Sequence, residues 1–374
     1  MKIGIITEYF PVSDALDVKG GAEACAFSEA KYLAKKHEVT VITSREAGTE
    51  KNDNICGINV IRCGRNRKYV QSGSIFSRLT FMLDAYKVGK KENFDILVGY
   101  NFVTYPVAWK IADKLKKPCV LRYHDVWIGE WVKNFGISGI FGELTERYVL
   151  SRDLDLILSV SEYTKNKLKK YFDPDKITVI PNIVDVNPLE VHKFQKPTLC
   201  CVSRLVDYKR VDDLLRAVAI LKESVPDIRC KIVGTGPKED YLKNLSEELD
   251  IKENVEFCGF IEDHDDVLKI VKSSHIFCFP SIVEGFGIVI VEAMASGVPF
   301  IASNIPPLVE ASGRKGGLFF EPKNYKEMAE KIKYVLNDEE LQKTLIIEGV
   351  AKSEEYKGEI VAERIEIIYK NLIK

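Results

Sequence analysis

Short apolar runs alternate along the chain with longer stretches in which apolar residues recur every three or four positions. The first pattern predicts buried strands and the second predicts amphipathic helices, so their alternation indicates an α/β protein with mostly parallel sheets. In the first half we expect strands at 2–7, 38–43, 57–62, 95–99, 118–123, 155–160 and 176–180, and helices at 21–36, 75–92, 104–116, 139–153 and 161–171.

The same alternation begins again after a segment that contains Pro181, Pro188 and Pro197. Prolines disfavour a continuous helix or a central strand, so residues 181–197 mark the boundary between two doubly wound domains. Beyond it we expect strands at 198–202, 228–233, 254–257, 275–279, 299–302 and 316–319, helices at 210–224, 236–249, 262–274 and 287–297, and two or three further helices from about residue 325.

The composition argues against several classes of protein, among them nucleic-acid-binding, zinc-containing and membrane-spanning proteins. The 374 residues suggest about two domains, and a formal net charge of −1 gives no support to bulk nucleic-acid binding. The nine cysteines have no framework spacing and no CxxC pair, which favours reduced thiols and argues against structural zinc. Because no apolar run reaches the ~18 residues of a membrane helix and no signal-peptide pattern opens the chain, we expect a cytoplasmic protein.

The most informative stretch is Glu284 to Glu292, Glu-Gly-Phe-Gly-Ile-Val-Ile-Val-Glu, which follows a predicted strand and opens a predicted helix. Backbone N–H groups around Phe286, Gly287 and Ile288 can face a phosphate or a sugar hydroxyl at such a helix start. A spacing of eight residues also turns both carboxylates towards roughly the same side. A general acid and base of a hydrolase would show the same spacing, so the pair alone leaves both interpretations open.

Other strand ends carry residues suited to a phosphorylated ligand. Arg204 and Lys209 follow the strand at 198–202, where planar paired donors and a mobile charge suit a diphosphate, although a solvated basic loop has the same composition. Gly20 and Gly21 open a predicted helix, where the backbone can approach a phosphate closely. The competing interpretation of the glycine pair is a plain tight turn.

Two further strand ends are less specific. Gly234 and Gly236 fall short of a dinucleotide fingerprint and predict a turn that passes close to a ligand or to a neighbouring strand. His124 ends another strand, where a neutral ring can donate to a sugar hydroxyl, while a surface or capping histidine is the alternative. Three Asp-x-Asp triplets, at 153–155, 173–175 and 263–265, lie away from the expected ligand side and are interpreted as turns and helix caps rather than metal ligands.

Together these residues resemble glycosyltransferase family 4, the retaining sugar-nucleotide enzymes with the GT-B fold. The resemblance spans nearly the whole chain, and Glu284 to Glu292 matches the family's Glu-x7-Glu signature. The hinge, Asn182-Ile183-Val184-Asp185, lacks the glycine that family members usually carry there. The matching segments are Gly20-Gly21-Ala22-Glu23, His124-Asp125, Val160-Ser161-Glu162, Pro181–Asp185, Ser203-Arg204-Leu205 with Lys209, Gly234-Thr235-Gly236-Pro237 and Glu284–Glu292.

The resemblance implies two Rossmann-like domains that face each other across a cleft: residues 1–185 with a C-terminal helix at about 358–374, and residues 186–357. It implies that Arg204 and Lys209 hold a donor diphosphate, with Gly234 and Gly236 nearby, and that Glu292 binds ribose hydroxyls. Glu284 and His124 would meet the transferred sugar, backbone amides of Phe286, Gly287 and Ile288 would reach sugar and phosphate, and Gly20 or Gly21 would approach the diphosphate from the first domain.

The implied reaction is the retaining transfer of a hexose-type sugar from a UDP- or GDP-sugar to a hydroxyl of a glycan, a lipid or a small molecule. The resemblance implies no metal and no cofactor, because Arg and Lys balance charge on the leaving group and the nucleotide sugar is a co-substrate. A nucleotide-sugar epimerase of the same fold, a phosphorylase and a non-catalytic nucleotide-sugar-binding protein are the alternatives.

Two features of the sequence indicate where an acceptor or a lipid surface could bind. Trp127 and Trp131 lie among apolar residues and glycines in 126–149, a composition that suits an acceptor or lipid surface, with core packing as the alternative. A basic cluster, Arg62, Arg65, Arg67 and Lys68, could meet anionic lipid at the inner face of a membrane, with a solvated loop as the alternative.

Overall fold

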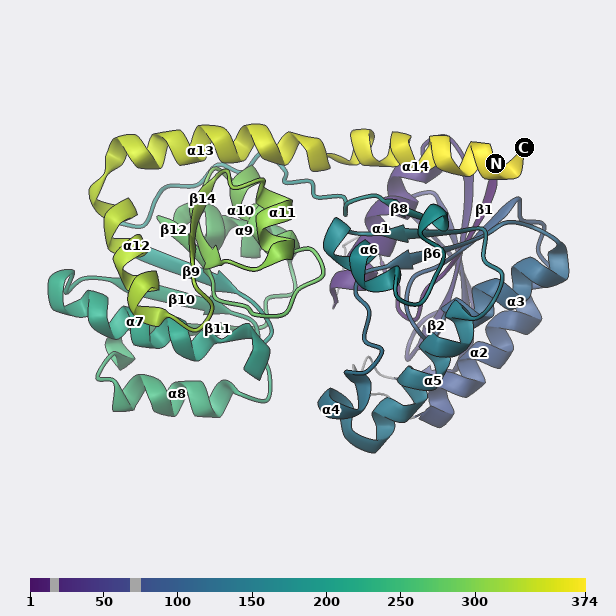
Figure 1. Ribbon diagram of the computed structural model, residues 1–374, viewed down its shortest axis with the longest axis horizontal. Coiled ribbons are helices and arrows are strands. Elements are labelled where there is room, and N and C mark those ends of the chain that lie inside the picture. Colours follow the sequence, from purple (N-terminus) through teal and green to yellow (C-terminus); the bar gives the residue numbers. More distant parts are fainter. Residues whose placement is uncertain (14–19, 68–74) are drawn as a thin grey trace. The chain divides into compact units, whose positions relative to one another are not determined.

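A computed structural model describes residues 1–13, 20–67 and 75–374 and divides the chain into two compact units. The first consists of Met1–Ile183 with Gly358–Lys374, and the second of Val184–Lys357. Each contains a sheet of mostly or entirely parallel strands with helices on both faces (Figure 1).

The first unit is built on a sheet of eight strands among the described residues, in the order β3-β4-β2-β1-β5-β6-β7-β8. All neighbouring pairs in it are parallel except β3 with β4. The strands are β1 (Lys2–Ile6), β2 (Glu38–Glu46), β3 (Asn52–Ile55), β4 (Ile58–Arg67), β5 (Ile96–Gly99), β6 (Cys119–Tyr123), β7 (Leu156–Ser159) and β8 (Ile177–Val179). The helices are α1 (Gly21–Ala34), α2 (Ile75–Gly89), α3 (Tyr105–Leu115), α4 (Trp131–Phe135), α5 (Gly139–Leu150), α6 (Glu162–Leu168) and α14 (Gly358–Ile373).

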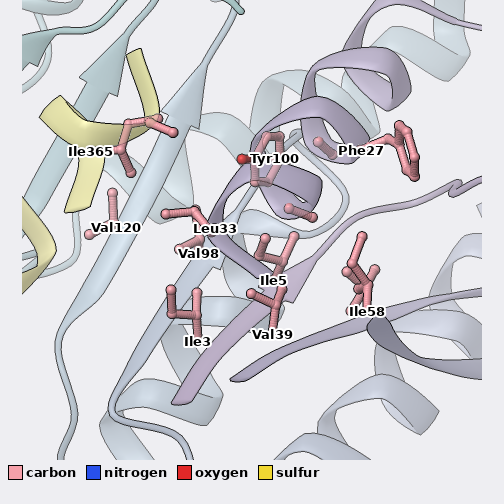
Figure 2. Packing of buried hydrophobic residues seen from close by; sticks show 14 of the residues in the cluster. Ile3, Ile5, Phe27, Leu33, Val39, Ile58, Val98, Tyr100, Val120 and Ile365 are labelled. Carbon is pink, nitrogen blue, oxygen red and sulfur yellow. The ribbon is translucent and has the colours of Figure 1, made fainter. Parts of the chain in front are cut away.

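Alternation along the central strands sends apolar side chains to both faces of this sheet, as expected for strands that helices cover on both sides. On one face, Ile3 and Ile5 pack with Leu33 of α1 and Ile365 of α14 (Figure 2). On the other, Ile6 and its neighbours pack against α2, α3 and α5. The last helix of the chain therefore completes the core of the first unit.

The second unit has a sheet of six parallel strands in the order β11-β10-β9-β12-β13-β14. The strands are β9 (Thr198–Val202), β10 (Arg229–Val233), β11 (Val255–Gly259), β12 (Ile276–Phe279), β13 (Phe300–Ser303) and β14 (Gly317–Phe320). The helices are α7 (Val211–Ser224), α8 (Glu239–Glu248), α9 (His264–Ser273), α10 (Ile288–Ala295), α11 (Pro306–Ser312), α12 (Tyr325–Asn337) and α13 (Glu339–Ser353).

Every strand and helix expected from the sequence is present, with ends that shift by a few residues. Among the strands and α-helices of the described residues, β3, α4 and α11 were missed. The strand β3 is polar (Asn-Asp-Asn-Ile) and forms a tight antiparallel hairpin with β4, so it carries little hydrophobic signal. No helix among the described residues is long and apolar enough to cross a membrane.

Candidate functional site

The order of strands in the second unit locates a binding edge. From β9 the chain proceeds to β10 and β11 on one side and later to β12, β13 and β14 on the other, so the order reverses between β9 and β12. In open α/β sheets, ligands bind beyond the carboxyl ends of the strands at such a reversal. The loops that follow β9 and β12 are the loops that carry Lys209 and Glu284.

Lys209 and Glu284 meet at this edge. The Lys209 Nζ atom lies 2.5 Å from Oε1 of Glu284, and the two side chains are only 16% and 13% exposed. The backbone ties the same loops together, because Ile282 N–H donates to the Tyr208 carbonyl over 2.9 Å. The ammonium also lies 5.0 Å from the centre of the Phe279 ring. An ammonium group and a carboxylate are therefore fixed side by side at the ends of neighbouring strands.

The amino terminus of α10 opens beside this pair. Its N-cap residue, Gly287, has φ of +94° and makes no side-chain capping bond, which leaves first-turn amides for a ligand. A Cβ at this position would lie 2.4 Å from the side chain of Leu308, so the turn requires glycine on both counts. Phe286 is buried and packs edge-on against Tyr356, whose hydroxyl donates to the Ala311 carbonyl. That contact anchors the loop immediately before Ile288.

Glu292 lies on α10 and contacts a residue that the sequence did not indicate. Nε2 of His264, the first residue of α9, is 2.9 Å from Oε1 of Glu292. The histidine is 48% exposed and the carboxylate 14%. The hydrogen bond with Glu292 raises the pKa of His264. No sequence motif joins residues 28 positions apart on different helices, so only the packing of α9 against α10 reveals the pair.

Arg204 is the second predicted phosphate ligand, and it is exposed in the loop after β9. Among the described residues it has no ion-pair partner. Lys209 is thus engaged with a carboxylate, while the Arg204 guanidinium keeps all its donors for solvent or a ligand.

Close packing against a neighbouring loop requires glycine at positions 234 and 236. A Cβ on Gly234, where φ is +121°, would lie 2.1 Å from the Ser203 carbonyl oxygen, and one on Gly236 would lie 2.3 Å from that of Leu205. Backbone hydrogen bonds join the same loops, from Ser203 N–H to Val233 and from Leu205 N–H to Thr235. These glycines bring the loop after β10 close to the loop that carries Arg204. Of the two alternatives predicted from the sequence, this is the turn that passes close to a neighbouring strand.

In the first unit, His124 follows β6 and its Nε2 atom is shielded from solvent without a hydrogen-bond partner among the described residues. Burial, with a contribution from the Arg122 guanidinium, lowers the pKa of His124 to about 3. The ring is therefore neutral at physiological pH and holds one unused hydrogen-bonding atom. A buried polar atom without a partner is uncommon and often marks a functional position.

The glycine pair of the first unit lies at the start of α1, with Gly20 as N-cap. No described atom lies within 4 Å of a Cβ built on Gly21, so packing within the described chain does not require a glycine there. Gly20 has an extended backbone with φ of −153°, which any residue can adopt. The room beside this helix start is compatible with a ligand that approaches the backbone.

A buried ion pair supports the region around His124. Arg122 and Glu29 are both 0% exposed and lie 2.7 Å apart, and Glu29 also accepts a hydrogen bond from the Tyr100 hydroxyl. The same guanidinium donates to the Ile180 and Pro181 carbonyls over 2.5 and 2.8 Å. The network therefore joins α1, β5, β6 and the segment that follows β8.

Part of the predicted acceptor surface was wrong. Trp131 is buried, and its indole N–H donates to Glu146 over 2.7 Å. A Cβ on Gly142 would lie 2.6 Å from the Trp131 ring, so that glycine admits the indole into the core. Burial raises the pKa of the Glu146 carboxyl to about 7. Ile137 and Ile140, which belong to the same predicted surface, are exposed, and so are Val132 and Leu144.

The predicted basic cluster was also wrong in one member. Arg62 is buried at 3% exposure and donates to the Pro11 carbonyl over 2.6 Å, so it fixes the loop after β1. Strand alternation explains this, because Arg62 shares a face of β4 with the buried Ile58 and Val60. Arg65 is exposed, with its guanidinium 5.6 Å from the centre of the Phe76 ring. The Arg67 side chain and Lys68 lie outside the described residues.

The Asp-x-Asp triplets serve structural roles. Asp173 and Asp263 each accept a backbone hydrogen bond two residues on, as N-caps of a 3₁₀ turn and of α9. Asp155 accepts from the Cys119 backbone N–H over 2.8 Å. Across the described ranges, no cluster of three or more His, Cys, Asp or Glu side chains has the arrangement of a metal site.

Comparison with known proteins covers almost the whole chain. Residues 19–188 match the family model described as Glycosyltransferase Family 4, and residues 189–351 match the model described as Glycosyl transferases group 1. An uncharacterized glycosyltransferase of Haemophilus influenzae is 33% identical over 220 residues, which are 58% of this chain and 62% of that protein. One of Methanocaldococcus jannaschii is 26% identical over 99% of this chain and 98% of its own length.

Solved structures share the architecture. Sucrose-phosphate synthase from Thermosynechococcus elongatus superposes with a TM-score of 0.84 at 20% identity, over 99% of this chain and 98% of that one. HepE from Anabaena, solved in complex with UDP-glucose, superposes with a TM-score of 0.77 at 18% identity over the full length of both chains. At these identities the likeness concerns the fold.

Proposed function

Because this chain belongs to the group 1 glycosyltransferases of family 4 and has their GT-B fold, we propose that it transfers a hexose-type sugar from a nucleotide diphospho-sugar to an acceptor hydroxyl with retention of configuration. One observation carries the proposal. At the strand-order reversal of the second unit, a phosphate-type cation, a carboxylate and an open helix amino terminus converge, in Lys209, Glu284 and the N–H groups after Gly287.

Each part suits a different piece of the donor. Lys209 and the exposed Arg204 bind the diphosphate, Arg204 through paired donors and Lys209 as a point charge. First-turn amides of α10 face the same negative charge, and the helix dipole adds to it. Glu284 accepts hydrogen bonds from the sugar hydroxyls, and Glu292, further along α10, accepts them from the ribose.

The first unit supplies two further contacts in this proposal. The ring of His124, which is neutral and partly exposed, meets a hydroxyl of the transferred sugar. The backbone at Gly20 and Gly21 approaches the diphosphate at the amino end of α1, where no described atom fills the space beside Gly21.

The reaction proceeds on one face of the sugar. The bond between the anomeric carbon and the diphosphate oxygen breaks, and the acceptor oxygen bonds to the same carbon from the side that the diphosphate leaves. The acceptor proton passes to a diphosphate oxygen, so configuration is retained and the leaving group is protonated. Arg204, Lys209 and the α10 amides stabilise the charge that develops on the diphosphate, and we propose that no metal ion is needed.

The donor class rests on the kind of ligand that the site accommodates and on one structural neighbour. HepE, of like fold, was solved with UDP-glucose, which supports a nucleotide diphospho-sugar as the donor here, and we propose a UDP- or GDP-sugar. The acceptor is a hydroxyl of a glycan, a lipid or a small molecule.

A lipid-linked acceptor would explain the exposed apolar side chains of the first unit. Ile137, Ile140 and Leu144 are 87%, 47% and 63% exposed. Their spacing of three and four residues forms a stripe on α5 and the turn before it. Lys133, exposed on α4, lies near one end of the stripe in sequence. We propose that this stripe contacts the inner face of a membrane that contains anionic lipid.

The experiment that tests the function follows a candidate UDP- or GDP-sugar by NMR, first alone and then with sugar and lipid acceptors. The proposal predicts an acceptor-dependent product whose anomeric configuration equals that of the donor. Conversion of the donor sugar without acceptor would identify an epimerase instead. Binding without turnover across the panel would identify a non-catalytic binding protein.

A further inference from the structure

His264, which contacts Glu292, lies outside the Glu284–Glu292 motif. His264 begins α9 directly after its N-cap, Asp263, and its ring reaches across to α10. Glu292 is the acidic residue of that helix, whose neighbours Val291 and Ala293 are fully buried. The carboxylate therefore reaches solvent at one side of α10 only, and the imidazole is its partner there.

We infer that His264 is a positioning residue for the donor nucleotide: it holds the Glu292 carboxylate in the orientation that accepts the ribose hydroxyls. This inference rests on the proposed function and extends it to a residue on another helix. Glu292 has three rotatable side-chain bonds, and a carboxylate fixed before the ligand arrives leaves less for the ligand to order.

The hydrogen-bonding capacity of Glu292 allows both partners at once. An ionised carboxylate has two oxygens with about four lone-pair sites. His264 Nε2 occupies one site on Oε1 at 2.9 Å. Oε2 and the second site on Oε1 remain for a vicinal diol, which can donate one hydrogen bond to each oxygen. The histidine therefore supports the ribose contact and does not compete with it.

Protonation of the His264 imidazole strengthens its contact with Glu292. The groups that face His264 are Glu292 from α10 and Asp263 and Asp265 from the start of its own helix, and all three are acidic. The hydrogen bond with Glu292 is the largest cause that raises the pKa of His264 above 6.5. The charged contact is therefore complete below pH 6.5 and weakens as the pH rises through the raised value.

The test measures binding of UDP and GDP, and of their 2′-deoxy counterparts, to the full chain by calorimetry. The variants are His264→Ala, His264→Gln, Glu292→Gln and the double variant His264→Ala/Glu292→Gln. His264 is half exposed, so the substitutions leave the core intact. Gln can place an amide N–H near the position of Nε2 without a charge, which makes it the matched control.

We expect His264→Ala to weaken the ribonucleotide about five- to tenfold and the 2′-deoxynucleotide little, because only the ribonucleotide uses the full Glu292 contact. His264→Gln should recover much of the loss. In the Glu292→Gln background, His264→Ala should cause no further loss. As the pH rises from below 6.5 through the raised pKa of His264, the wild type should lose ribonucleotide affinity relative to His264→Ala, which lacks this titrating group.

Equal loss for both nucleotides, or an undiminished effect of His264→Ala in the Glu292→Gln background, would overturn the positioning role. Wild-type affinity in His264→Ala would overturn it as well, while leaving the proposed function in place. If the wild type binds neither UDP nor GDP, the proposed function fails and the positioning role fails with it. The two failures are distinguished by the wild-type measurement.

Discussion

Lys209 and Glu284, 75 residues apart in sequence, form a largely buried ion pair with Nζ 2.5 Å from Oε1. It joins the loops after β9 and β12, the neighbouring strands between which strand order reverses. In the proposed complex the two groups face adjacent parts of one ligand, the diphosphate and the sugar. The pair therefore fixes the two loops relative to each other.

Replacement of Glu284 by Gln or Ala should reduce transfer more than nucleotide binding. A hydrogen bond to a charged group contributes about 1.5–3 kcal/mol, so loss of the sugar contact should lower kcat/KM roughly 10- to 150-fold. Affinity for the nucleoside diphosphate, which lacks the sugar, should change little. Steady-state kinetics and calorimetry on the same variants measure both quantities. Equal losses in both would place Glu284 at the nucleotide and not at the sugar.

Arg204 can be replaced without destabilising the protein, so its substitution tests donor binding alone. Because it is exposed and no described residue pairs with it, Arg204→Ala should leave the melting temperature unchanged. Donor affinity should fall about tenfold or more, and Arg204→Lys should recover part of it, since Lys keeps the charge but not the paired donors. With excess EDTA, wild-type activity should persist. Strict dependence on a divalent ion would contradict the proposed charge balance.

Alanine substitution should affect stability differently at Gly234, in the second unit, and at Gly21, in the first. Gly234→Ala places a methyl group at a positive φ and against the Ser203 carbonyl, so it should destabilise the protein by about 1–3 kcal/mol. Gly21→Ala meets no described atom, so the free energy of unfolding should stay the same or rise slightly. Donor affinity of Gly21→Ala should nevertheless fall. Unaltered donor affinity in this stable variant would remove Gly21 from the site.

The buried ion pair between Arg122 and Glu29, close to His124, should contribute strongly to the free energy of unfolding. Glu29→Ala leaves a fully buried guanidinium without its carboxylate, and a loss of about 3–5 kcal/mol in the free energy of unfolding is expected. Glu130→Ala, which removes the exposed partner of Lys133, is the control and should change little. Urea denaturation measures both. A small effect for Glu29 would show that water or a rearranged partner compensates the charge.

The exposed stripe on α5 predicts membrane association. Wild-type protein should co-sediment with vesicles that contain anionic lipid. Ile140→Ser/Leu144→Ser should reduce the bound fraction with little change in melting temperature, because the two side chains are 47% and 63% exposed. Ile347→Ser in the second unit, exposed at 70%, is the matched control. Absence of wild-type binding would exclude this surface as a lipid contact.

The regular elements were predictable because the apolar periods are strong, and the elements that were missed have identifiable causes. The helix α11 begins with Pro306 and Pro307 and is capped by Gly313, a pattern that favours a helix, but at seven residues it is too short to show a clear apolar period. Arg62 was assigned to solvent on charge, although its parity with Ile58 and Val60 on β4 indicated the core. Strand alternation was the better guide there.

The site was predictable where its residues share a segment, as from Glu284 to Glu292, and not where it depends on tertiary contact. No local pattern indicates that Lys209 and Glu284 pair or that His264 reaches Glu292, because each contact joins loops or helices far apart in sequence. The unpaired Nε2 atom of His124 is likewise a property of packing.

The most direct test of the proposed function is a thermal-shift panel of nucleotide sugars on the wild type and on Arg204→Ala. A ligand at 100 times its Kd should stabilise the native state by about 2.7 kcal/mol. The proposed function predicts that at least one UDP- or GDP-sugar raises the wild-type melting temperature without added metal, and that the shift is much smaller in Arg204→Ala. No shift with any nucleotide sugar, or an equal shift in the variant, would contradict it.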